Sequence, residues 1–191
     1  MVKAMTETPV KIQLDRLSFA GQIHLISTDQ ELQTVAGALA AAKVLGFDTE
    51  TKPSFKKGEV FKVALLQLAT ATDAYLIRLH FITEFTVLKA IFENEQILKV
   101  GVAIRDDLKL LRKAFPFHPK NFNELQDLAK KKGMANFGLK GMTEEVLQAT
   151  ISKGAKMTNW QAAELTKAQQ LYAATDAWIG LMLYQKISQI K

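Results

Sequence analysis

The stretch VLGFDTETKP, residues 44–53, sets an apolar run directly before two carboxylates, Asp48 and Glu50. A short apolar run bounded by turn residues predicts a buried strand over 44–50. Side chains two apart in a strand point to the same face, so Asp48 and Glu50 would lie side by side, with Thr49 turned away. Two adjacent carboxylates repel each other. Either both reach solvent where the strand ends, or a cation offsets their charge.

The overall composition indicates one soluble globular domain. The chain has 191 residues, 48% of them hydrophobic, and no cysteine, which excludes disulfides and thiolate zinc sites. Its three histidines are scattered. No apolar stretch approaches the roughly 20 residues that span a bilayer, and the N-terminus lacks the apolar core of a signal peptide. We therefore expect an intracellular, cytoplasmic protein with no membrane partner.

The rest of the chain alternates between strand and helix patterns. Residues 27–43 read as a helix with Ser27 or Thr28 as N-cap and Gln30 or Glu31 closing a capping box, and a last helix begins at Thr166. Between them, strands are expected at 60–70, 73–79 and 97–104, helices at 83–95, 105–115, 121–133 and 138–150, and a loop or short helix at 151–164. This order predicts an α/β domain over 25–191, a mixed sheet flanked by helices, with 1–24 as an N-terminal extension packed on it.

Further carboxylates stand at two other places. Asp106 and Asp107 open the helix after the strand at 97–104, where acids can simply favour the helix dipole. Asp176 lies in an otherwise apolar helix, with Tyr172 four residues earlier on the same helical face. Acidic groups from three separated elements, with no His or Cys, form a set of hard oxygen ligands that favours magnesium or manganese. Two such ions roughly 4 Å apart can hydrolyse a phosphodiester.

Basic residues are concentrated in one segment. The chain has a net charge of +6, and the ten basic and four acidic residues between Lys99 and Lys140 account for all of it. Such a segment is either a solvated face of surface helices or a surface that follows the phosphates of a nucleic acid. Charge alone leaves both interpretations open.

Four motifs, in order and spacing, resemble the DEDDy 3′-5′ exonucleases, within the superfamily of ribonuclease D and proofreading exonucleases. They are FDTE at 47–50, KVALLQL at 62–68, the glycine and D-L-x-L-L run from Gly101 to Leu111, and Tyr172-x-x-x-Asp176. TNW at 158–160 and LYAATDA at 171–177 are most similar to the Werner-type branch. The resemblance covers residues 25–190 and implies a ribonuclease H-like fold with a mixed five-stranded sheet.

The resemblance also implies roles for five residues. Asp48 would bridge two divalent ions, Mg²⁺ or Mn²⁺, while Glu50 and Asp176 complete the site that holds the attacking water. Asp107 would serve the second ion through water, and Tyr172 would orient the nucleophilic water. A DEDDh relative would carry histidine five residues before its last aspartate, where this chain has leucine, so the tyrosine subclass fits.

The second motif is ambiguous, because Asp106 precedes Asp107. Spacing from the glycine and the run that follows favour Asp107, and Asp106 is the second choice. Successive helical residues diverge by about 100°, so both cannot face one metal equally well. Asp127 lies near a position where relatives often carry an acid, and we assign it a structural role.

Substrate contacts are expected around the first motif. Phe47 and Thr49 would pack on the terminal nucleotide, while Phe55, Lys56 and Lys57 in the following loop would guide the strand or remain a solvated loop. The predicted function is a metal-dependent exonuclease that binds a nucleic acid with a free 3′ end and releases nucleoside 5′-monophosphates, with DNA favoured. The alternatives are an RNA-processing exoribonuclease of ribonuclease D type and a catalytically silent nucleic-acid-binding module.

Overall fold

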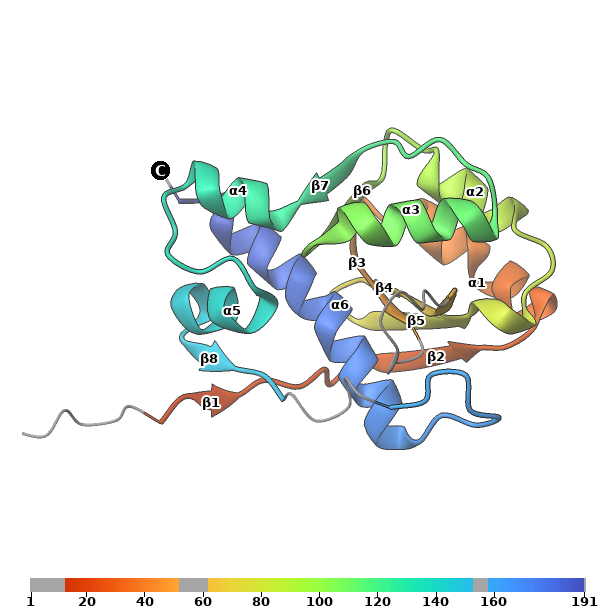
Figure 1. The fold of residues 1–191 in the computed structure, drawn as a ribbon, viewed down its shortest axis with the longest axis horizontal. Helices are drawn as coiled ribbons and strands as arrows, with labels where there is room; N and C mark the ends of the chain where they lie inside the picture. Colours follow the sequence, from red (N-terminus) through yellow and green to blue (C-terminus); the bar gives the residue numbers. More distant parts are fainter. Residues whose placement is uncertain (1–12, 52–61, 153–157, 191) are drawn as a thin grey trace, which may run out of the picture.

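The protein is built on a six-stranded mixed sheet with helices on both faces (Figure 1). A computed structural model describes residues 13–51, 62–152 and 158–190. The strands of the sheet, in chain order, are β2 (Gln22–Ile26), β3 (Val44–Thr51), β4 (Val63–Ala69), β5 (Asp73–Arg78), β6 (Leu98–Gly101) and β7 (Phe122–Glu124).

The order of strands across the sheet is β2-β5-β4-β3-β6-β7. Strand β4 runs antiparallel to both neighbours, β3 and β5, while the other pairs are parallel. The fold class expected from the sequence is confirmed, with one strand more than predicted. That strand, β7, takes the first residues of the segment expected as a helix from 121, because Phe122 packs into the aromatic core and pairs with Lys99 of β6.

Helices begin where the sequence predicts caps. Thr28 is the N-cap of α1 and accepts a hydrogen bond from the Glu31 N–H, and Thr166 forms a full capping box with Gln169 at α6. In chain order the helices are α1 (Asp29–Ala41), the 3₁₀ turn η1 (Leu79–Phe81), α2 (Thr86–Phe92), α3 (Ile104–Ala114), α4 (Leu125–Lys131), α5 (Leu139–Leu147) and α6 (Lys167–Ile187).

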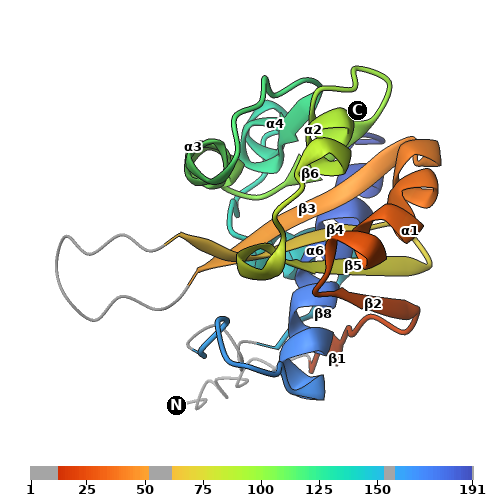
Figure 2. The ribbon, with the colours of Figure 1, turned by 90° about the vertical axis from the view of Figure 1, so that its right-hand side faces the viewer.

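The two faces of the sheet are packed differently. Helices α1, α2 and α3 cover one face over a core rich in large side chains, among which the Phe92 ring lies 5.0–6.0 Å from the rings of Phe47, Phe115, Phe117 and Phe122. Helix α6 crosses the other face, where Ala64, Leu65 and Ala69 of β4 meet alanines of the helix (Figure 1). Figure 2 shows α2 and α3 far from β2, the strand at one edge of the sheet.

A second, two-stranded sheet lies outside the main one. It pairs β1 (Asp15–Arg16) with β8 (Ala149–Thr150) in parallel. The boundary at residue 25 expected from the sequence falls inside β2, so the end of the proposed extension belongs to the main sheet. Residues 1–12 of that extension lie outside the described residues. None of the helices in the described ranges has the length and apolarity that a membrane crossing requires.

Candidate active site

Strand β3 directs two carboxylates toward α6. Asp48 lies opposite Gln67 of β4 and Glu50 lies opposite Leu65, so both acids share the face that α6 covers. Between Glu50 and Thr51 the register shifts by one residue, an irregularity of the kind that re-aims side chains next to active sites. The predicted strand and the pairing of the two acids on one face are both confirmed.

Helix α6 approaches β3 closely because position 46 has no side chain. A Cβ on Gly46 would lie 2.0 Å from the carbonyl oxygen of Ala177, well inside van der Waals contact. The close approach brings Asp176, the residue before Ala177, to the two acids of β3. Ligand oxygens of Asp48, Glu50 and Asp176 all lie within 4.8 Å of one another. The structure therefore brings together three of the four predicted metal ligands.

This cluster has the chemistry of a divalent cation site. Asp176 is buried, with 8% of its surface exposed, and Asp48 and Glu50 are half-buried. Three carboxylates held this closely in a partly buried place repel one another strongly unless positive charge is present. The cluster lies in a cleft, and among the described residues that line this cleft the one basic side chain is Lys140, which is paired with Glu144. Oxygen-only ligands of this kind suit hard divalent ions such as Mg²⁺ and Mn²⁺.

Tyr172 stands one helical turn before Asp176 and is half-buried beside the cluster. Burial raises the pKa of its hydroxyl, and the negative charges of Asp176 and Glu50 raise it further, as does a hydrogen bond to Asp176. A phenol with a strongly raised pKa stays protonated at neutral pH. Tyr172 can therefore donate a hydrogen bond at this site, but it cannot act as the base.

Asp107 reaches the site from the other side of β3. Its carboxylate accepts a 2.7 Å hydrogen bond from the Thr49 hydroxyl, which points away from the face of Asp48 and Glu50. Burial raises the pKa of Asp107 to about 6, against the lowering effect of the Thr49 hydrogen bond. Asp107 is not a member of the three-carboxylate cluster, so its predicted role toward a second ion stays a prediction.

The neighbouring Asp106 has a different environment. It is exposed and bonded to Lys109 at 2.8 Å, and this hydrogen bond together with the lysine charge lowers its pKa. The start of α3 is held by Glu124 of β7, whose carboxylate accepts the N–H groups of Ala103 and Ile104 at 2.8 Å each. Because only Asp107 faces β3, the geometry favours it over Asp106. That Glu124 caps this helix was not predictable from the spacing of residues in the sequence.

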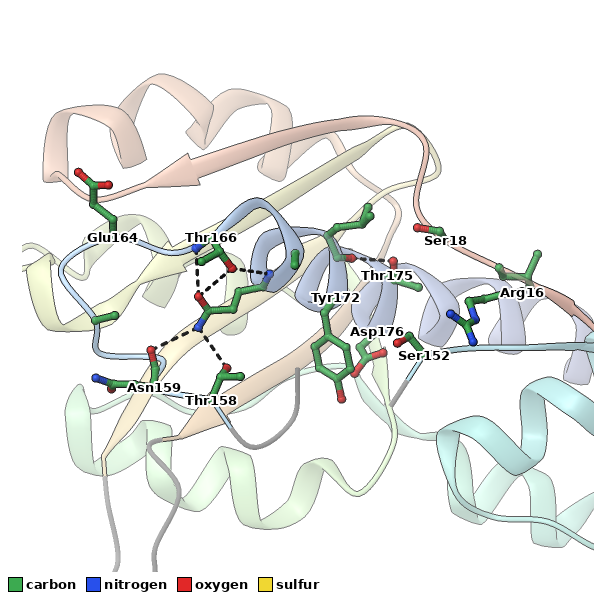
Figure 3. A pocket seen from close by; sticks show the side chains of 15 residues that line it. Arg16, Ser18, Ser152, Thr158, Asn159, Glu164, Thr166, Tyr172, Thr175 and Asp176 are labelled. Carbon is green, nitrogen blue, oxygen red and sulfur yellow. Dashed lines mark hydrogen bonds between the residues drawn. The ribbon is translucent and has the colours of Figure 1, made fainter. Parts of the chain in front are cut away.

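The cluster lies where two cavities meet. One, of about 700 Å³, is a cleft lined by Phe47 to Glu50, by Val102 and Ala103 just before α3, and by parts of α4, α5 and α6. The other, of about 730 Å³, extends along the first half of α6 and shares Ser152, Tyr172 and Asp176 with the cleft. Figure 3 shows Tyr172 and Asp176 side by side in the second cavity, with Arg16 across from them. A substrate could therefore approach the carboxylates from either side.

The predicted substrate residues have different outcomes. Thr49 lines the cleft, although its hydroxyl is engaged by Asp107. The Phe47 ring is enclosed in the core, with its centroid 6.0 Å from that of Phe92, so in this conformation Phe47 can meet a nucleotide only through its backbone. The expected contact of Phe47 with the terminal nucleotide stays a prediction. Phe55, Lys56 and Lys57 lie outside the described residues.

The basic segment divides into local contacts. Lys99 is fully buried and donates to the carbonyl oxygens of Ile91 and Asn94, at 3.2 and 3.0 Å, so it is no part of a solvated face. Of the ten basic residues, only Lys140 lines the cleft. The ion pairs in this segment are Arg105–Asp127, Lys109–Asp106, Lys120–Glu95 and Lys140–Glu144. The Arg105 pair agrees with the structural role expected for Asp127.

Two tryptophans pack against other side chains of the fold. Trp160 is fully buried against Leu65 and Leu165, with its ring centroid 6.2 Å from that of Tyr172. Trp178 packs against Phe19 at 5.9 Å. Trp160 thus packs against Tyr172 from within the core.

The fold and the site together define a nuclease of the ribonuclease H-like class. The chain belongs to a family of 3′-5′ exonucleases, whose family model matches residues 23–190. It is 35% identical to the mouse bifunctional 3′-5′ exonuclease/ATP-dependent helicase WRN over 83% of this chain and 12% of that protein. It is 31% identical to ribonuclease D of Escherichia coli over 86% of this chain and 44% of that enzyme.

Solved structures agree with this assignment. The crystal structure of E. coli RNase D superimposes with a TM-score of 0.80 at 30% identity, covering 87% of this chain and 44% of that one. The EXO domain of Aedes aegypti Nibbler gives the same TM-score at 24% identity and shares the fold, covering 93% of this chain and 92% of that one. The chain spans less than two thirds of the length of the curated relatives it matches. It covers 12% of the mouse protein and 51% of the mimivirus protein.

Proposed function

We propose that this chain is a 3′-5′ exonuclease that uses two divalent ions, Mg²⁺ or Mn²⁺, to release nucleoside 5′-monophosphates from the 3′ end of a nucleic acid. The observation that carries the proposal is the convergence of Asp48, Glu50 and Asp176 within 4.8 Å. Family membership supports the same reaction, since the matching family model is one of 3′-5′ exonucleases.

The three carboxylates would hold the ions from two elements. Asp48 is the candidate for a ligand shared by both ions, as the resemblance of the sequence motifs implies. Glu50 and Asp176 would complete one site. Bound divalent ions supply an activated water and neutralise charge on the phosphate and the leaving oxygen. Asp107, held by Thr49 across β3, is the candidate ligand toward the second ion.

Tyr172 would position the attacking water. Its hydroxyl stays protonated because burial and the nearby carboxylates raise its pKa, so it offers a donor beside the cluster. A positioned donor lowers the orientational cost of the reaction without taking the proton itself. We therefore expect Tyr172→Phe to slow the reaction less than removal of any carboxylate of the cluster.

The proposed substrate is a nucleic acid read through its backbone. Carboxylates and ions engage the scissile phosphate, which carries no information about base identity. DNA is the favoured substrate because the sequence motifs are most similar to the Werner-type branch, and the chain is 35% identical to the mouse WRN protein. RNA is the second candidate, supported by 31% identity to E. coli ribonuclease D.

The direct test is a digestion with end-labelled substrates. Single-stranded DNA, 3′-recessed DNA and matched RNA are incubated with the protein and Mg²⁺ or Mn²⁺. We expect a ladder that shortens from the 3′ end and disappears on addition of EDTA. Comparison of DNA with RNA at equal concentration decides the sugar preference. Binding of all substrates without any ladder would leave only the silent binding module.

A further inference from the structure

Strand β4 contains one buried polar side chain in an otherwise apolar sequence. Gln67 stands between Leu66 and Leu68 in VALLQLA and is completely buried. Neither its amide nitrogen nor its amide oxygen has a hydrogen-bond partner among the described residues. Nearly all buried polar side chains in proteins have a hydrogen-bond partner. An amide without one therefore indicates that it gains a partner in another state of the protein.

The position of Gln67 ties it to the carboxylate cluster. In the β3–β4 register Gln67 is directly opposite Asp48. Side chains opposite each other on antiparallel strands point to the same face, with their Cβ atoms about 5 Å apart. Gln67 therefore lies beneath α6 on the same face as Asp48 and Glu50. Its side chain, two methylene groups ending in an amide, is long enough for the amide to meet a carboxylate on the adjacent strand.

Packing alone does not account for a glutamine here. Both neighbours on β4 are leucines, and Leu76 of β5, opposite Gln67 on its other side, is also fully buried. Methionine has nearly the same length and would fill this space with no unpartnered donor or acceptor. The glutamine thus costs stability in the metal-free protein. A benefit in another state would explain its presence.

We infer that Gln67 is a positioning residue for Asp48, an assignment that rests on the proposed two-ion function. When the site holds its ions, the Gln67 amide donates a hydrogen bond to the Asp48 carboxylate and fixes which oxygen faces the cations. Asp48 Oδ1 already accepts the Thr49 N–H at 2.9 Å, and a carboxylate has room for several donors. An amide is neutral and can hold a carboxylate without competing with the ions. A lysine at this position would compete with them through its positive charge.

The substitution that tests this is Gln67→Met, which keeps the buried volume and removes the amide. Groups that orient a metal ligand typically contribute 10- to 100-fold to metal affinity or activity. We expect Gln67→Met to need about 10-fold more Mn²⁺ or Mg²⁺ for half-maximal digestion. Without metal, its melting temperature should equal or exceed that of the wild type, because the unpartnered amide is gone.

A readout independent of activity is the rise in melting temperature on Mn²⁺ addition. We expect the Mn²⁺ concentration that gives half of this rise to increase about 10-fold in Gln67→Met. Leu66→Met is the matched control, since it makes a comparable change on the same strand toward the opposite face, and it should leave the Mn²⁺ titration unchanged. Gln67→Glu, which cannot donate when ionised and adds negative charge, should be affected more than Gln67→Met.

The outcomes separate this inference from the proposed function. If the wild type gives neither a ladder nor a Mn²⁺-dependent rise in melting temperature, the proposed function fails. If the wild type gives both and Gln67→Met titrates with Mn²⁺ like the wild type, the positioning role of Gln67 is overturned while the function stands. Should Gln67→Met not fold, Gln67→Leu serves in the same titration, with the same deciding result.

Discussion

The two faces of the central sheet are built for different purposes. On the face covered by α1, α2 and α3, phenylalanines with ring centroids 5.0–6.0 Å from Phe92 fill the space. On the face covered by α6, small residues such as Gly46, Ala173 and Ala177 let the helix approach the strands. The first face gains stability from buried area. The second gives up side-chain volume so that carboxylates from a strand and a helix can meet.

Asp107 marks the boundary between these two faces. It comes from α3, on the aromatic side, and reaches β3 through the Thr49 hydroxyl, while Asp48 and Glu50 point to the α6 side. The end of β3 therefore holds acids on both faces of the sheet, with Asp48 and Glu50 on one and Asp107, bonded to Thr49, on the other. Changes on either face should consequently have different effects on stability and on activity.

Loss of Asp48 should have the largest effect. We expect Asp48→Ala to lower the rate of digestion by about 10³-fold or more, because several kcal/mol of metal-derived stabilisation are lost. The free energy of unfolding without metal should stay equal or rise, since one of three mutually repelling carboxylates is gone. Kinetics and denaturant titration of the same preparation check both parts. A rate within 10-fold of wild type would refute the metal assignment.

On the aromatic face, Phe92→Ala should reduce stability without touching the chemistry. Phe92 is fully buried, and truncation of such a side chain costs about 3–5 kcal/mol. Below the melting temperature of the variant, the specific activity of the folded protein should match that of the wild type. A large loss of activity in folded Phe92→Ala would mean that the two faces are coupled more tightly than the comparison implies.

On the α6 face, Gly46→Ala should lower both stability and activity. The loss of activity should be larger than one added methyl group suggests. The new Cβ would stand 2.0 Å from the Ala177 carbonyl oxygen, so helix and strand must separate. Misplacement of catalytic groups by about 1 Å can cost about 100-fold in rate. Gly37→Ala, an added methyl in open space on α1, is the matched control and should change neither activity nor, by more than about 1 kcal/mol, stability.

Lys99 provides a pH-dependent test of the aromatic face. Burial lowers the pKa of its ammonium group to about 8, whereas in the unfolded chain it titrates near 10.5. Between these pH values the unfolded state binds the extra proton, so stability rises with pH across this window, by at most about 3 kcal/mol. The difference in the free energy of unfolding between wild type and Lys99→Met, measured from pH 8 to 10.5, should show this rise.

The smallest contrast is between two adjacent aspartates of α3. Asp107→Asn should slow digestion about 10-fold, within the range seen when groups around a metal site are removed. Asp106→Asn should stay within about twofold, because Asp106 is exposed and its contact with Lys109 is a surface ion pair. Parallel rate measurements decide the alignment of the second motif, and a larger loss at Asp106 would reverse it.

Local signals in the sequence predicted much of this arrangement. The cap at Thr28, the capping box at Thr166 and the apolar run ending at Asp48 each depend on a few neighbouring residues, and the structure confirms all three. The roles of Lys99 and Glu124 depend on partners far away in the chain. A lysine between apolar residues looks exposed until the carbonyl groups that receive it are known, and Glu124 caps a helix 20 residues earlier.

The features of the site also separate into those that local sequence spacing predicted and those that depend on tertiary packing. The i,i+4 spacing of Tyr172 and Asp176 and the i,i+2 spacing of Asp48 and Glu50 determined which side chains share a face. The direction from which Asp107 arrives, across the strand through Thr49, followed from how α3 packs and was not predictable from spacing. The role of Gln67 was not predictable either, because a polar residue in a strand is common and only the structure shows that this one is buried without a hydrogen-bond partner.

The capping box of α6 has a consequence for catalysis. Gln169 bonds to Thr166 at the helix start, and its amide also donates to the Thr158 hydroxyl and the Asn159 carbonyl (Figure 3). These contacts fix the rotational phase of the helix at its first turn. Asp176 follows about two turns later, and a slip of a single residue would rotate it by about 100°. Hydrogen bonds at the start of the helix thus decide the angle at which Asp176 meets the strand.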